Sequence, residues 1–220
     1  MKKLVQVVGV VLCMAAMARA ASVDDLTTQL KDKDAETRRA AARGLADAGA
    51  DAKPAVPALI DALKDKDVFV RRFSAQALGN IGPDAKEATP SLAAILKDGK
   101  DKKEVQAAAA DALGKFGPGG VDALVAVVKD GKRDADIRSK AIAAIGAIGA
   151  DAKPAVPALI DALKDKDVRT DAATALGAIG PAAKDAVDAL QEAVSDKKKV
   201  KKDKPFKQAV NDALKKINAK

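Results

Sequence analysis

The sequence predicts an all-α fold, an α-solenoid of about six stacked helical hairpins from about Val23 to Ile217, which follows a secretory signal peptide. One reason is an internal copy, because the 20 residues 49–68 recur without change at 149–168. A second reason is that the apolar residues expected to close the first helix of each hairpin recur every 31 to 35 residues, at Leu30, Leu63, Leu96, Val128, Leu163 and Val194. A fixed period in this range is typical of solenoids, in which each repeat buries its apolar face by stacking on its neighbours.

The chain begins with the features of a signal peptide, which we expect to span residues 1–20. A start with two lysines is followed by a mostly apolar stretch over residues 4–18 and by small residues at Ala18 and Ala20. This order is typical of a secretory leader and its cleavage site. Cleavage after Ala20 would export the remaining domain, residues 21–220, to the periplasm or the exterior of a bacterium.

Two alternatives to a cleaved leader stay open. An uncleaved membrane anchor is one, although the apolar stretch is shorter than the ~20 residues that a spanning helix needs. Lipid attachment at Cys13 is the other, although Leu12 stands where lipoprotein acylation needs a small residue. We expect no later segment to be apolar enough to cross a membrane.

The two helices of each hairpin follow from apolar spacing. In the second repeat Leu59 and Leu63 lie four residues apart, and the apolar residues from Val70 to Ile81 recur at helical intervals. Asp67 lies between the two helices and suits an N-cap. Glycine suits the left-handed position after a helix, and a following proline can open the next one. The second helices are therefore expected to end at Gly49, Gly82, Gly117, Gly149, Gly180 and Asn218.

The repeated motifs resemble the short bacterial HEAT-like repeat that is named after the phycobilisome bilin lyases. Val56–Asp65 and Val156–Asp165 carry the first motif, and Leu78–Gly82 and Leu176–Gly180 carry the motif that closes the second helix. The resemblance implies a HEAT-like solenoid over almost all of the chain after the leader. It leaves the activity open, because the family includes scaffolds, lyase subunits and a di-iron hydroxylase.

The residue types that the chain lacks exclude most catalytic and metal sites. The chain has no His, Trp or Tyr, and it has one Cys. Without His there is no imidazole base, and a di-iron site of the HEAT type is excluded. Asp130, Asp134 and Asp136 lack the ligand spacing and turn glycine of a calcium loop. Gly117–Gly120 lacks the Lys-Ser/Thr that follows a phosphate loop. We therefore expect no enzyme activity, no cofactor and no metal.

A recurring pair of charges indicates a structural role. When the second helices are aligned, five of the six repeats have an aspartate four residues before a cation: Asp34 and Arg38, Asp67 and Arg71, Asp134 and Arg138, Asp165 and Arg169, Asp203 and Lys207. The third repeat loses both members together, because Lys102 and Gln106 stand there. We interpret the set as a ladder that joins hairpin loops to neighbouring helices. A row of arginines that binds an anionic ligand is the alternative.

The outward positions of the second helices are basic in the first two repeats and bland in the fourth and fifth. The candidate partner-binding residues are Arg39, Arg43, Arg72 and Gln76. In a HEAT-like solenoid these helices line the concave face, so we hypothesise that the four residues contact an acidic segment of a partner protein. An ordinary solvated helix face is the alternative.

The formal net charge of +8 is concentrated at the chain ends. The Lys-rich terminal repeat, residues 195–220, has 10 basic and 3 acidic residues, whereas the frame of residues 21–194 has 26 basic and 28 acidic residues. The run 197–204 could bind a polyanion, or it could be a solvated loop or polar cap. The nearly neutral frame argues against nucleic acid as its partner.

These observations predict an exported, non-catalytic and monomeric scaffold that binds another protein or an acidic peptide segment. Polyanion binding through the terminal repeat and a ligand-handling role like that of a bilin lyase are the alternatives.

Overall fold

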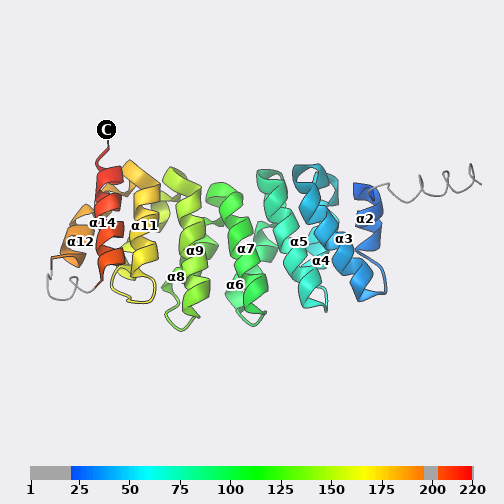
Figure 1. Ribbon diagram of the computed structural model, residues 1–220. Helices are drawn as coiled ribbons and strands as arrows, with labels where there is room; N and C mark the ends of the chain where they lie inside the picture. The colour runs from blue at the N-terminus through cyan, green and yellow to red at the C-terminus, as the bar shows by residue number, and fades with distance from the viewer. Residues whose placement is uncertain (1–20, 196–202, 220) are drawn as a thin grey trace, which may run out of the picture.

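The computed structural model describes residues 21–195 and 203–219 (Figure 1). The expected signal peptide with Cys13, and most of the Lys-rich run, lie outside the described residues. The described α-helices follow one another in pairs: α2 (Val23–Gln29) and α3 (Ala35–Ala48), α4 (Val56–Ala62) and α5 (Val68–Ile81), α6 (Thr89–Asp98) and α7 (Lys103–Lys115), α8 (Val121–Lys129) and α9 (Ala135–Ile148), α10 (Val156–Ala162) and α11 (Arg169–Ile179), α12 (Val187–Ala193) and α14 (Lys204–Ile217). These pairs confirm the predicted all-α solenoid of helical hairpins.

The helices form two layers. The second helix of each pair packs on the second helix of the next pair, in the order α3, α5, α7, α9, α11 and α14. The first helices cover one side of this row, and Figure 1 shows the second helices side by side in front of them. The residues that anchor the second helices are fully buried: Leu45, Leu78, Leu113, Ile145 and Leu176. The side of the row that the first helices leave uncovered is called the second-helix face below.

Small residues let neighbouring second helices approach closely. A Cβ added at Gly79 of α5 would lie 3.0 Å from the Cα of Ala112 on α7. A Cβ at Gly114 would lie 2.9 Å from the Cβ of Ala144 on α9. The distance at Gly114 is shorter than real Cβ contacts and that at Gly79 is tighter than most of them, so a larger side chain at either glycine would require the neighbouring helix to shift. Close packing of small aliphatic residues explains why so few aromatic residues are needed in the core.

Each second helix ends at a glycine corner, except for the last. The glycines predicted as caps have positive φ angles between 57° and 79°, at Gly49, Gly82, Gly117, Gly149 and Gly180. A short 3₁₀ segment then turns the chain toward the next first helix: η1 (Gly49–Ala55), η2 (Gly82–Ala88), η3 (Gly117–Gly120), η4 (Gly149–Ala155) and η5 (Gly180–Ala186). The last second helix ends at Asn218, as expected. The corner η3 is shorter than the others.

One run of helical residues, Ala135–Ala162, is long and apolar enough to cross a membrane by length and composition alone. The expectation that no segment after the leader would pass this test was wrong. The run contains the corner at Gly149, which divides it into α9, η4 and α10. Much of it is buried against neighbouring repeats, as is typical of core helices.

Candidate functional site

Arg38 of α3 ties the first repeat to the second through the loop end of the solenoid. Its Nε and Nη2 donate to the two carboxylate oxygens of Asp65, at 2.7 and 3.0 Å. Its Nη1 donates to the backbone carbonyls of Asp32 and Lys33 in its own hairpin loop. Arg38 is nearly fully buried, and each nitrogen of its guanidinium donates to an acceptor of the protein. Its role is therefore structural, since it links the two repeats.

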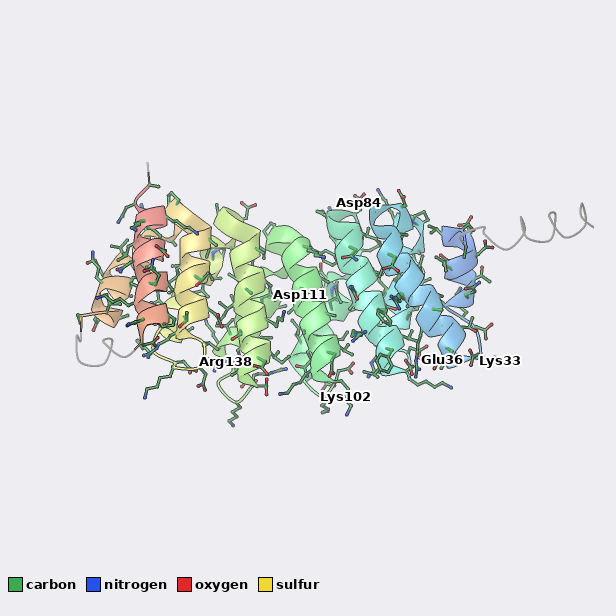
Figure 2. All side chains as sticks on the ribbon, in the orientation of Figure 1. Lys33, Glu36, Asp84, Lys102, Asp111 and Arg138 are labelled. Carbon is green, nitrogen blue, oxygen red and sulfur yellow. The ribbon has the colours of Figure 1, made fainter. Side chains whose placement is uncertain are left out.

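The same arrangement recurs at three other junctions. Arg71 donates to both oxygens of Asp101, Arg138 donates to Asp165 at 2.7 Å, and Arg169 donates to Asp203 at 2.6 Å. Each pair joins one repeat to the next. Arg169 keeps this position although α11 is shorter than α5, with 11 residues against 14, and begins at Arg169 itself. Figure 2 labels Arg138 along the same edge of the solenoid as Lys33 and Lys102.

The arginines of the predicted ladder are in place, but three of its predicted acids are not. Asp34, Asp67 and Asp134 cap the N-termini of their own helices, where each carboxylate accepts from backbone N–H groups. Asp67 and Asp134 do contact the previous repeat, but their partners are Arg39 and Lys103 and not the ladder residues. Asp203 of the last repeat both caps α14 and pairs with the ladder arginine Arg169. The acids that pair with Arg38 and Arg71 lie just before the N-cap position.

Sequence reasoning therefore missed Asp65 and Asp101. A signal for both was present, because each repeat that follows Arg38 or Arg71 has an aspartate one or two residues before its N-cap position. Asp165 lies in the corresponding loop of the fifth repeat, and the sequence predicted it in a pair with Arg169, four residues further on. Its partner is instead Arg138 of the preceding repeat.

The ion pairs hold the ladder carboxyls in the charged form. Burial alone would raise the pKa of Asp65, but hydrogen bonds from Arg38 and from the Asp67 N–H outweigh it and lower that pKa. The pKa of Asp101 is lowered in the same way by Arg71 and by the Lys102 N–H, against its burial. A hydrogen bond from Arg39 lowers the pKa of Asp67 far below its ordinary value, with further help from the helix N–H groups.

The junction between the third and fourth repeats has a different contact. Gln106 replaces the ladder arginine, and its side-chain N–H donates to the carbonyls of Gly99 and Asp101. Its amide oxygen accepts from Nη1 of Arg133 at 3.2 Å. Arg133 is paired with Asp130 of its own loop, so no carboxylate joins the two repeats at the ladder position.

The four candidate partner-binding residues lie on or beside the second-helix face but differ in their availability. Arg39 is committed to Asp67 of the next repeat through Nε, at 2.9 Å, and through Nη2. Arg43 is exposed and lies 4.0 Å from Asp47 of its own helix. Gln76 is exposed on α5. Arg72 has a different kind of neighbour, because it lies over aromatic rings.

Arg72, Phe69 and Phe73 form a cluster at the N-terminal end of α5. The guanidinium carbon of Arg72 lies 4.6 Å from the centroid of the Phe73 ring and 5.5 Å from that of Phe69. Arg39 covers Phe69 at 4.9 Å. These distances are in the range of cation–π contacts. Sequence reasoning did not single out either phenylalanine.

A groove on the second-helix face begins at this cluster. The central groove has a volume of about 760 Å³ and is lined by residues of α5, α7 and α9. Its polar lining comes from α5 and α7: Arg72, Gln76, Asn80, Glu104, Asp111 and Lys115. Its floor and far side are small residues: Ala75, Gly79, Ala107, Ala108, Ala112, Gly114, Ala143, Ala144 and Ala147. Figure 2 labels Asp111 on α7, in the middle of this face. The small residues that bring the helices together therefore also hollow their surface.

Within the described ranges 21–195 and 203–219, no group of acidic residues and cysteines is arranged to hold a metal ion. The aspartates that suggested a calcium loop have other contacts. Asp134 caps α9 and pairs with Lys103, and Asp130 pairs with Arg133.

Comparisons with solved structures show which proteins have a similar fold. An engineered protein is 26% identical, with a TM-score of 0.60 over 89% of this chain and 96% of its own. Kap121p bound to Nup53p is 19% identical, with a TM-score of 0.66 over 87% of this chain and 22% of its own. The phycocyanin lyase complex of CpcE and CpcF from Nostoc sp. PCC7120 is 22% identical, with a TM-score of 0.53 over 89% of this chain and 94% of its own.

No curated protein matches the chain. The family model of HEAT repeats matches residues 23–114, 99–166 and 121–215, which together cover nearly all of the described chain. The matched ranges contain the stacked hairpins, the glycine corners and the ladder of ion pairs described above. The chain belongs to the HEAT-repeat family.

Proposed function

We propose that this chain is an exported, non-catalytic scaffold that binds an extended segment of a partner protein along its second-helix face. The observation that carries the proposal is the central groove, which crosses α5, α7 and α9 and therefore spans three consecutive repeats. A groove that crosses three neighbouring helices suits an extended chain better than a compact small molecule.

The lining supports a protein partner. The exposed Ala143 and the half-buried Ala107 give an apolar surface, and Gln76, Asn80 and Asp111 supply polar groups beside it. Asn80 is already fixed, because its side-chain amide donates to the carbonyl of Ala46 and accepts from Lys115. A surface that combines apolar contact with fixed polar groups suits a polypeptide.

The structural neighbours support the same class of function. Kap121p is bound to Nup53p in its crystal structure, and CpcE and CpcF form a complex with each other. HEAT-like folds therefore engage protein partners in both cases. A catalytic role has no support from residue chemistry, because the chain has no His and the groove lining offers no activated nucleophile.

Site-specific photo-crosslinking in the producing cell tests the proposal. A photoreactive amino acid at Ala143 lies in the groove, whereas one at Asp122, on α8 of the same repeat, lies exposed outside it. We expect a discrete crosslinked protein from position 143 and none from position 122. Equal crosslinking from both positions, or none from position 143, would contradict the proposal.

Export is tested separately. We expect the protein recovered from the producing cell to begin at Ala21, as read by N-terminal sequencing, and to be found outside the cytoplasm. A mature chain that retains Lys2 and Lys3 would contradict cleavage of the leader.

A further inference from the structure

Arg72 differs from the other arginines in the described part of the chain. Each of the others has a carboxylate oxygen within 4.0 Å: Arg38, Arg39, Arg43, Arg71, Arg133, Arg138 and Arg169. No described carboxylate forms an ion pair with Arg72. An arginine is charged at any physiological pH, so Arg72 presents an uncompensated positive charge on the second-helix face.

The surroundings of Arg72 hold it in place without neutralising it. Its Nε is covered by the protein and has no hydrogen-bond acceptor among the described residues. The guanidinium instead lies over the rings of Phe69 and Phe73. Ring faces attract the cation but accept no conventional hydrogen bond, so the remaining N–H groups stay available at the end of the central groove.

Phe69 adds an apolar surface beside this charge. It is 43% exposed, and it is the one exposed large hydrophobic side chain among the residues described. Arg39 lies over its ring, and Arg39 is itself held by Asp67. A fixed and partly exposed aromatic ring is typical of the residues that dominate binding energy, because little conformational entropy is lost when a partner covers it.

We infer that Arg39, Phe69, Arg72 and Phe73, the Arg72–Phe69 patch, anchor a partner segment in which a carboxylate stands next to an apolar residue. The carboxylate accepts hydrogen bonds from Arg72, and the apolar side chain covers Phe69. The rest of the segment runs along the central groove. This inference rests on the proposed function. Of the four candidate partner-binding residues it keeps Arg72 as the one that binds the carboxylate, and it adds the ring of Phe69 as a second contact.

The charges along the groove favour a polypeptide over a nucleic acid. Glu104 and Asp111 lie further along it and would repel a continuous row of phosphates. One uncompensated guanidinium matches one carboxylate, and Phe69 gives an apolar contact that a phosphate backbone does not use. Charge complementarity and apolar contact therefore point to the same class of partner.

Fluorescence anisotropy with two labelled peptides tests the inference. Both have a frame of Gly, Ser and Ala, with Leu-Glu-Leu at the centre of one and Leu-Gln-Leu at the centre of the other. We expect residues 21–220 to bind the acidic peptide about tenfold more tightly than the amide peptide, because a hydrogen bond to a charged group is lost in the second. Arg72→Gln should remove most of the preference for the acidic peptide, because Arg72 binds the carboxylate. Phe69→Ala should remove most of the affinity for that peptide, because Phe69 binds the apolar side chain.

Arg43→Gln is the matched control, since it removes an equal charge from an exposed arginine of the same face. We expect it to change affinity less than twofold, and circular dichroism should show that all variants keep the wild-type helix content. Equal binding of the two peptides, no binding of either, or equal losses in Arg72→Gln and Arg43→Gln would overturn the inference. Tighter binding of a short DNA duplex than of the acidic peptide would do the same. If a photoreactive group at position 143 crosslinks to a partner and any of these results is also obtained, the proposed function is supported and only the inference of an acidic partner segment is rejected.

Discussion

At the scale of single residues, two kinds of aspartate stand close together and have different tasks. Asp67 caps α5 and pairs with Arg39, whereas Asp65, two residues earlier, pairs with Arg38. Both act across the same junction between repeats. The loop sequence Lys-Asp-Lys-Asp therefore encodes a helix start and a tie to the preceding repeat at once.

Removal of one ladder arginine should destabilise the protein measurably. Arg71 and Asp101 are mostly buried, so Arg71→Gln leaves a carboxylate that has lost its partner. We expect a loss of about 2 kcal/mol in the free energy of unfolding, measured by urea denaturation. Arg43→Gln, at an exposed pair, should cost less than about 0.5 kcal/mol. Equal losses in the two variants would show that the ladder does not stabilise the solenoid.

The ladder also predicts how stability depends on pH. The pKa values of Asp65, Asp101 and Asp165 are lower in the folded chain than their ordinary value. Their contribution is therefore complete above the unfolded pKa and is lost as the pH falls toward the folded pKa. We expect little change in unfolding free energy between about pH 5.5 and 7.5, since the chain has no His, and a decline below about pH 4.

Urea denaturation at a series of pH values measures this dependence. The variant Asp101→Asn removes one of the titrating carboxyls, so its stability should decline less steeply below about pH 4 than that of the wild type. Parallel curves for the two proteins would exclude Asp101 as a source of the acid sensitivity.

At the scale of helices, the distance between neighbouring second helices depends on single glycines. Gly177 of α11 faces Ala213 of α14, and an added Cβ would lie 2.8 Å from the Cα of Ala213. Gly146 of α9 faces Ala175 with a looser distance of 3.3 Å. The helical period alone does not distinguish these two positions, because both lie on faces that pack against the next repeat.

The two glycines therefore give a matched pair of substitutions. We expect Gly177→Ala to destabilise the protein by about 1–3 kcal/mol, because backbone atoms of α14 must move. Gly146→Ala should be nearly neutral. The new methyl group would contact Ala175 slightly more closely than is usual, but alanine favours the helix over glycine by about 0.5–1 kcal/mol. Thermal unfolding followed by circular dichroism measures both. A neutral Gly177→Ala would contradict the close packing of α11 on α14.

At the scale of the whole molecule, the ladder divides into two halves. Ladder ion pairs join the first three repeats to one another and the last three to one another. At the junction between these halves the ladder position has Gln106 and Arg133 instead. The short corner η3 lies at the same junction, and the central groove crosses it. This junction still has one ion pair, between the exposed Lys103 and Asp134. Because a solenoid is stabilised by each repeat and by each junction separately, and an exposed pair contributes little, the missing ladder pair affects stability at this junction.

A double substitution should create an ion pair at the ladder position between the third and fourth repeats. Gln106→Arg alone brings a cation toward Arg133, and Arg133→Asp alone brings an acid toward Asp130, so each should be destabilising. We expect the double variant to be more stable than the sum of the two changes predicts, with a coupling of about 1–2 kcal/mol in a double-mutant cycle. Additive effects would show that the two positions do not interact across the junction.

The sequence by itself determined the repeat, the order of the helices, the glycine corners, the positions of the ladder arginines and the absence of histidine chemistry. These properties follow from period and residue type, which are local in the chain. Only the tertiary structure decided that Asp65 and Asp101 pair with the arginines, that Arg72 has aromatic neighbours instead of a carboxylate, and that small residues form a groove. The physical reason is that most of these contacts join residues of different repeats, and their choice depends on side-chain direction between stacked helices.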